Sequence, residues 1–128
     1  MREGLDKKLV ADFPILYQTR HFSPEYTAMC WGFECGDGWE PLIRELSTKI
    51  EAHNNGHPES PIIAFQVKEK FGGLRFYVNA APPEIHDLIE EYERRSYDTC
   101  EGCGKPGKMR EGSWLQTLCD ECHKGRDG

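Results

Sequence analysis

Cysteine is the residue type whose spacing in this 128-residue chain points most clearly to chemistry. Four of the six cysteines form two Cys-x-x-Cys pairs, Cys100/Cys103 and Cys119/Cys122, with fifteen residues between the pairs. Each pair fits a tight turn that directs both sulfurs to one point, and four thiolates complete the tetrahedron that Zn²⁺ prefers. Because no coordination position remains for water or substrate, we expect one structural zinc in a C-terminal zinc ribbon.

Three other uses of these cysteines are disfavoured. Two disulfides are typical of exported proteins, and the acidic segment 1–6 does not resemble a secretory signal. A redox dithiol needs a single pair between a strand and a helix. The segment 119–123 matches the attachment motif of c-type haem, but haem would leave Cys100 and Cys103 without a role.

Cys30 and Cys35 leave two interpretations open. Together with His21 or His57 they could form a second metal site. Alternatively, one or both are small buried residues of the core, as free cysteines commonly are. Their spacing is wider than that of a metal-binding knuckle, which favours the second interpretation.

A cluster of cations is the second feature that could bind a ligand. Residues 61–80 contain three basic side chains and one acidic one, in a chain whose net charge is −6. Lysine and arginine pair with phosphate or carboxylate groups, glycines let an anion approach the backbone, and aromatic rings stack on nucleobases. The competing interpretation is that the glycines only form a turn and the lysines only protect a strand from aggregation. The candidate ligand-binding residues are Trp31, Lys68, Lys70, Gly72, Gly73, Arg75 and Tyr77.

The remaining ionisable residues do not form a recognisable catalytic set. The sequence contains no nucleophile elbow, P-loop, HExxH or HNH-type motif. Glu34, Asp37 and Glu40 could chelate a cation, but Asp37 and Glu40 are explained more simply as a helix-capping pair. We therefore predict no catalytic residue and no enzymatic activity, with an unrecognised hydrolase as an alternative.

Helical periodicity indicates the helices that must position these groups. Apolar residues recur at helical spacing within 5–13, and Pro14 then starts a second, short helix. A longer helix follows the capping pair Asp37/Glu40, and another begins at Pro82-Pro83. The apolar faces of the two longer helices consist of Trp39, Leu42, Ile43, Leu46, Ile50, Ile85, Leu88, Ile89 and Tyr92.

Alternating apolar residues indicate the strands. Residues 63–67 and 74–78 alternate on either side of Gly72-Gly73, which predicts a β-hairpin. A short strand is expected around residues 31–33, and a second hairpin within 108–117, between the two cysteine pairs. The predicted fold is α+β, with helices packed on a β-hairpin or antiparallel sheet and a C-terminal zinc ribbon.

Length and composition fit one main core with a small appended module. We predict an α+β main domain over 1–97, a zinc-ribbon module over 98–124 packed on it, and a disordered tail over 125–128. No stretch approaches the roughly 20 apolar residues of a membrane span, so we expect a soluble, intracellular protein.

Overall charge disfavours general binding to nucleic acids. The net charge of −6 becomes −8 when four thiolates hold one Zn²⁺, and sequence-independent affinity for nucleic acids comes mainly from lysine and arginine. A nucleic-acid-binding regulator is therefore an alternative rather than the first expectation. Its contacts would come from the ribbon residues Lys105, Lys108, Arg110 and Lys124.

Three segments resemble a family of small uncharacterised phage and prophage proteins. They are the string CWGFECGDGW at 30–39, the hairpin string QVKEKFGGLRFY at 66–77, and the paired cysteines with their flanking residues at 100–107 and 114–122. The similarity covers nearly the whole chain in the same order. The resemblance implies an accessory phage protein in the cytoplasm of a bacterial host, of a class that commonly antagonises bacterial defence or redirects a host factor.

These observations together predict a non-enzymatic binding protein with one structural zinc. The expected partner is a host protein or a small anionic, nucleotide-like ligand, with no role for a membrane.

Overall fold

A sheet of three strands organises the main domain in the computed structural model, which describes residues 1–127. The strands β1 (Phe33–Glu34), β2 (Ala64–Lys70) and β3 (Gly73–Val78) lie in the order β1-β2-β3. The hairpin of β2 and β3 is antiparallel as predicted, but β1 pairs with β2 in parallel. The sheet is therefore mixed rather than purely antiparallel, because a helix connects β1 to β2 and returns the chain to the same end.

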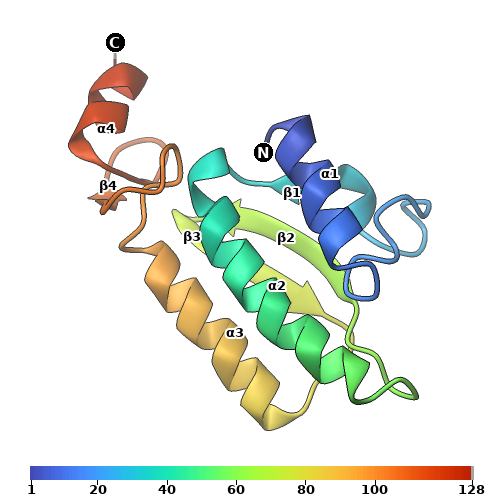
Figure 1. The fold of residues 1–128 in the computed structure, drawn as a ribbon. Helices are drawn as coiled ribbons and strands as arrows, with labels where there is room; N and C mark the ends of the chain where they lie inside the picture. The colour runs from blue at the N-terminus through green and yellow to red at the C-terminus, as the bar shows by residue number, and fades with distance from the viewer. Residues whose placement is uncertain (128) are drawn as a thin grey trace.

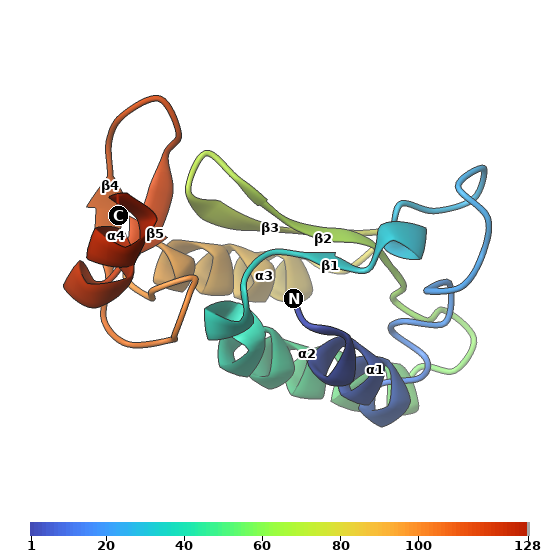
Figure 2. The same cartoon turned by 90° about the horizontal axis from the view of Figure 1, so that it is seen from above.

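Three helices lie on one side of this sheet, and the other face is open (Figure 2). They are α1 (Glu3–Asp12), α2 (Glu40–Asn55) and α3 (Pro83–Ser96), with α2 and α3 side by side (Figure 1). This arrangement confirms the α+β prediction. None of the helices within residues 1–127 combines the length and the apolar character that a membrane span requires.

The core lies between the helices and the covered face of the sheet. The apolar face predicted for α2 is confirmed, since Trp39, Ile43, Leu46 and Ile50 are completely buried while Leu42 is partly exposed. The face predicted for α3 is buried in the same way. From the sheet and the segment after α1, the core receives Leu16, Tyr17, Phe33, Val67, Leu74 and Phe76.

The short helix expected after Pro14 does not form. Residues 14–21 are a series of turns. The backbone N–H groups of Ile15 and Leu16 donate to the carboxylate of Glu51 on α2, at 2.9 and 3.0 Å. The first N–H groups of a helix have no partner within the helix, and here a side chain from a distant element accepts hydrogen bonds from these donors. Periodicity within the segment cannot indicate such a partner.

The capping pair predicted before α2 was also wrong. Asp37 begins a 3₁₀ turn, Asp37–Trp39, and accepts a hydrogen bond from the backbone of Arg2 at 2.8 Å. Glu40 forms an ion pair with Arg44 one turn later, at 2.7 Å. The strand expected through residues 31–33 is shorter than predicted, because Met29–Trp31 is another 3₁₀ turn.

Side chains from the helices cap both edges of the sheet. Along the free edge of β3, the N–H of Leu74 donates to the hydroxyl of Ser96 and the N–H of Phe76 donates to the carboxylate of Glu93, both at 2.9 Å. At the opposite edge, the N–H of Phe33 donates to Asp6 at 3.3 Å. Edge donors that could pair with another chain are thus occupied within the fold.

The C-terminal module consists of a hairpin and a helix. The strands β4 (Lys108–Arg110) and β5 (Gln116–Leu118) form the predicted hairpin, and α4 (Asp120–Asp127) follows. A disordered tail was expected over 125–128, but residues 125–127 belong to this helix, and residue 128 lies outside the described residues. Figures 1 and 2 both show the module at one end of the main domain, beside the β2–β3 turn.

Replacing Glu93 tests the capping of the β3 edge. Burial raises the pKa of the Glu93 carboxyl, although the N–H of Phe76 opposes the change. The folded chain therefore holds this proton more tightly than the unfolded chain. The resulting stabilisation is complete below the unfolded pKa and is lost as pH rises through the folded pKa.

Glutamine keeps an oxygen for the Phe76 N–H without the charge. We expect the unfolding free energy of Glu93→Gln to equal that of the parent at about pH 4. At about pH 7 it should be higher than that of the parent by roughly 0.5 kcal/mol, a small difference because solvent screens this half-buried group. Urea unfolding at both pH values measures the difference. A difference that does not change with pH contradicts this assignment.

Candidate functional site

The two cysteine pairs meet at one point in the C-terminal module. The sulfur atoms of Cys100, Cys103, Cys119 and Cys122 all lie within 4.8 Å of one another. The Sγ atoms of Cys103 and Cys119 are 3.6 Å apart. Four sulfurs this close, from two Cys-x-x-Cys pairs, can hold one metal ion.

Different backbone structures hold the two pairs. The first pair lies in a tight knuckle, where the N–H of Gly104 donates to the carbonyl of Cys100 at 2.9 Å and Gly104 has φ +83°. The second pair was predicted to form a similar knuckle, but Cys122 lies in the first turn of α4 and its N–H donates to the sulfur of Cys119 at 3.4 Å. The positive end of a helix stabilises thiolates, so this placement suits metal ligands.

The thiols of the cluster have pKa values shifted in opposite directions. Burial acts to raise the pKa of Cys100, but backbone N–H groups outweigh it and lower that pKa to about 7. In contrast, hydrogen bonds with Cys119 and Cys100 raise the pKa of Cys122 to about 12. Thiolates at this separation repel one another, and a divalent metal relieves that repulsion.

The loop before α2 contacts the first knuckle through Glu101. The N–H of Gly36 donates to the Glu101 carboxylate at 2.9 Å, and the N–H of Gly38 donates to the Glu101 carbonyl at 2.8 Å. A Cβ on Gly38 would lie 2.2 Å from the carbonyl oxygen of Cys100. The indole N–H of Trp39 donates to the carbonyl of Thr99 at 2.9 Å. The glycines of the CWGFECGDGW string therefore allow the backbone to approach the metal ligands closely.

The β2–β3 turn contacts the second half of the module. The hydroxyl of Thr117 on β5 donates to the carbonyl of Gly72 at 2.7 Å. The side chain of Met109 covers Gly72, and a Cβ added to Gly72 would lie 2.6 Å from that side chain. The ring of Tyr97 covers Gly73, and a Cβ added to Gly73 would lie 2.3 Å from that ring. The N–H of Gly72 donates to Glu69 at 2.9 Å. Gly72 and Gly73, predicted to admit an anion, are instead covered by protein.

The predicted cations do gather on one surface. Lys68 pairs with Arg75 across the hairpin, and Gln66 pairs with Tyr77. Because side chains alternate along a strand, these residues and Lys70 point to the face of the sheet opposite the core. We call this surface, formed by Gln66, Lys68, Lys70, Arg75 and Tyr77, the open face.

Charges on the open face are mostly unpaired. Within residues 1–127, neither Lys68 nor Lys70 forms an ion pair. Arg75 is half-buried and donates to the hydroxyl of Tyr97 at 3.1 Å. The carboxylate of Glu34 on β1 lies opposite Lys68 and accepts a hydrogen bond from Gln66 at 3.3 Å. The face keeps a net positive charge in an acidic protein.

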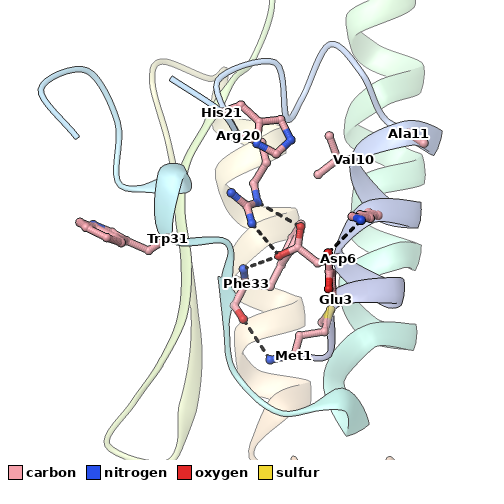
Figure 3. A pocket seen from close by; sticks show the side chains of 10 residues that line it. Met1, Glu3, Asp6, Val10, Ala11, Arg20, His21, Trp31 and Phe33 are labelled. Atoms are coloured by element: carbon pink, nitrogen blue, oxygen red, sulfur yellow. Dashed lines mark hydrogen bonds and ion pairs between the residues drawn. The ribbon is translucent and has the colours of Figure 1, made fainter. Parts of the chain in front are cut away.

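Trp31 is exposed beside a cavity that the sequence did not indicate. The cavity, of about 470 Å³, lies between α1 and β1, and Figure 3 shows the Trp31 ring pointing away from it and from α1. Arg20 Nε donates to Asp6 at 3.0 Å on the cavity wall, and a Cβ on Gly32 would lie 2.5 Å from that carboxylate. The Asp6–Arg20 ion pair joins α1 to the segment before β1, which accounts for Gly32.

Burial or ion pairing explains Cys35 and two of the ribbon cations suggested by the sequence. Cys35 is buried in the core, and burial, with the nearby charge of Glu101, raises its pKa to about 12. The only cluster of three or more possible metal ligands within residues 1–127 is the four-cysteine site, so Cys30 and Cys35 form no second one. Lys105 pairs with Glu121 and Arg110 pairs with Asp120, which weakens the case for a nucleic-acid surface on the module.

Comparison with protein-family models, with curated proteins and with solved structures finds no match to this chain.

Replacing Gly38 tests the contact between the main domain and the metal site. Because the added Cβ of Gly38→Ala would collide with backbone, we expect a loss of at least about 2 kcal/mol in unfolding free energy and faster release of metal to a chelator. Gly4→Ala is the matched control, since a Cβ there has no neighbour within 4 Å. Thermal unfolding and chelator competition provide the measurements. Equal behaviour of the two variants would show that the contact is not required.

Proposed function

We propose that this protein is a non-enzymatic binding protein, in which one structural Zn²⁺ holds the C-terminal module and the open face binds an anionic, nucleotide-like ligand. Four cysteine ligands support zinc, because thiolates in a closed tetrahedron are typical of structural zinc sites. The single observation that supports the binding role is the group of unpaired cations beside Tyr77 on an uncovered sheet face.

The chemistry of the open face suits phosphate and a base together. Lys68 and Arg75 are cross-strand partners on this face, but the Arg75 guanidinium donates to Tyr97 and to the carbonyl of Leu74, so Lys68 and Lys70 are the cations available to pair with an anion. Tyr77 is 42 % exposed on the same face, and its ring offers a surface on which a base can stack. A nucleotide supplies both groups.

The biological setting is proposed from the sequence resemblance to phage and prophage proteins. We propose that the protein acts in the cytoplasm of a bacterial host and that its ligand belongs to a defence response that the phage antagonises. The segments of this resemblance include the loop and the turn that contact the metal module. Because these segments hold the two parts of the fold together, their resemblance to phage proteins supports a similar fold more directly than a similar ligand.

Metal analysis tests the zinc. We expect one zinc per chain in the purified protein and loss of that zinc in Cys119→Ser, because a missing thiolate opens the tetrahedron. Elemental analysis by mass spectrometry measures the content. A different metal, or haem absorbance, would overturn the assignment.

Calorimetric titration with ATP and with inorganic phosphate tests the open face. We expect the double variant Lys68→Ala/Lys70→Ala to bind ATP at least about fivefold more weakly, since two unpaired cations are lost. Lys7→Ala/Lys8→Ala removes the same charge from α1, on the covered side of the sheet, and should bind like the parent. Equal weakening in both variants would indicate a general charge effect, and absence of ATP binding to the parent would reject the proposed ligand class.

A further inference from the structure

A groove continues the open face across the boundary between the main domain and the metal module. It has a volume of about 620 Å³. One wall is the end of β2 with its turn, and the other is the loop between β4 and β5. Its charged and aromatic lining residues are Lys68, Glu69, Lys70, Phe71 and Trp114.

Phe71 has a conformation that its side chain disfavours. Its φ is +53°, and Gly72 follows with φ +85°, as a two-residue hairpin turn with two left-handed residues requires. Asparagine or glycine is the usual residue at such a position, and a bulky side chain there costs roughly 1–2 kcal/mol. The Phe71 ring does not repay this cost by burial, because 65 % of the residue is exposed. This disfavoured backbone presents an exposed aromatic ring that is available to a partner.

Trp114 presents a second exposed ring across the groove. It is 64 % exposed and lies in the loop between β4 and β5. The hydrogen bond from Thr117 on β5 to Gly72 holds the end of this loop against the β2–β3 turn. The ammonium group of Lys70 lies 5.7 Å from the centre of the Phe71 ring. Two exposed rings with cations beside them are the elements of a surface that stacks bases and neutralises phosphates.

The separation of the aromatic groups indicates the length of the ligand. Tyr77 lies four residues along β3 from Gly73 at the turn, a distance of roughly 13 Å. The pair of Lys68 and Arg75 lies between them. One nucleotide cannot reach both Tyr77 and the rings of Phe71 and Trp114, whereas a short strand can.

We infer that the open face and this groove together bind a short single strand of nucleic acid, with bases on Tyr77, Phe71 and Trp114 and phosphates near the cations between them. This inference rests on the proposed nucleotide-binding role of the open face and extends it from one nucleotide to several. The acidic remainder of the protein repels polyanions, so binding is confined to this surface. Because Trp114 belongs to the metal module, the complete surface exists only when the metal holds that module in place.

Fluorescence anisotropy with labelled oligothymidylate of ten nucleotides tests the inference, with an oligouridylate of equal length and a DNA duplex as further arms. We expect at least tenfold tighter binding of the single strands than of a mononucleotide or the duplex. Only about three cations face the strand, so the logarithm of the binding constant should fall with the logarithm of salt concentration with a slope near about −2.

Phe71→Asn separates binding from folding. Asparagine favours the left-handed conformation, so the melting temperature should stay equal or rise while affinity for the oligonucleotide falls roughly tenfold. Trp114→Ala should weaken binding similarly, and Tyr26→Ala, which removes an aromatic residue that is 71 % exposed on another loop, should not.

The outcomes distinguish this inference from the function on which it rests. Equal affinity for mononucleotide and oligonucleotide would reject the strand and keep the nucleotide site. Oligonucleotide binding that Phe71→Asn and Trp114→Ala leave unchanged would reject the groove. Binding of neither probe would reject both proposals and direct attention to a protein partner.

Discussion

The contact between Glu101 and the loop before α2 is the constraint on which the rest of the structure depends. One residue beside a metal ligand accepts hydrogen bonds from Gly36 through its side chain and from Gly38 through its backbone. Its own N–H donates to the carbonyl of Thr117, which in turn donates from its hydroxyl to Gly72. A short chain of hydrogen bonds thus joins the first knuckle, the module hairpin and the β2–β3 turn.

This connection links the four-cysteine site to the main domain. Among the described residues of the module, the hydrophobic core consists of Leu118, Cys100 and Cys119, with Cys122 packed against it, and so small a core does not fold without further support. Metal binding at the four cysteines is expected to supply that support and to hold Trp114 beside Phe71. The open face lies entirely within the main domain and does not depend on the metal. The groove, in contrast, is formed by the main domain and the metal module together.

Much of this organisation could be predicted from local patterns in the sequence. The cysteine spacing identified the four ligands, alternation identified the β2–β3 hairpin, and helical periodicity identified the buried faces of α2 and α3. Each of these signals lies within one segment and depends on one period or one motif.

Features that depend on distant partners could not be predicted in this way. The pattern of Asp37 and Glu40 suggested a helix cap, but Asp37 binds the backbone of Arg2, and only the tertiary structure brings them together. Gly72 and Gly73 suggested space for a ligand, although the side chains of Met109 and Tyr97 fill that space. The role proposed for Phe71 could not be predicted either, because its left-handed conformation and its exposure are properties of the folded turn.

Amide hydrogen exchange with and without the metal tests the central claim most directly. If the metal site holds the module against the main domain, chelation should abolish protection at the N–H groups of Gly36 and Gly38, which donate to Glu101, while the N–H groups within α2 remain protected. Unchanged protection of Gly36 and Gly38 after complete removal of the metal would contradict the account.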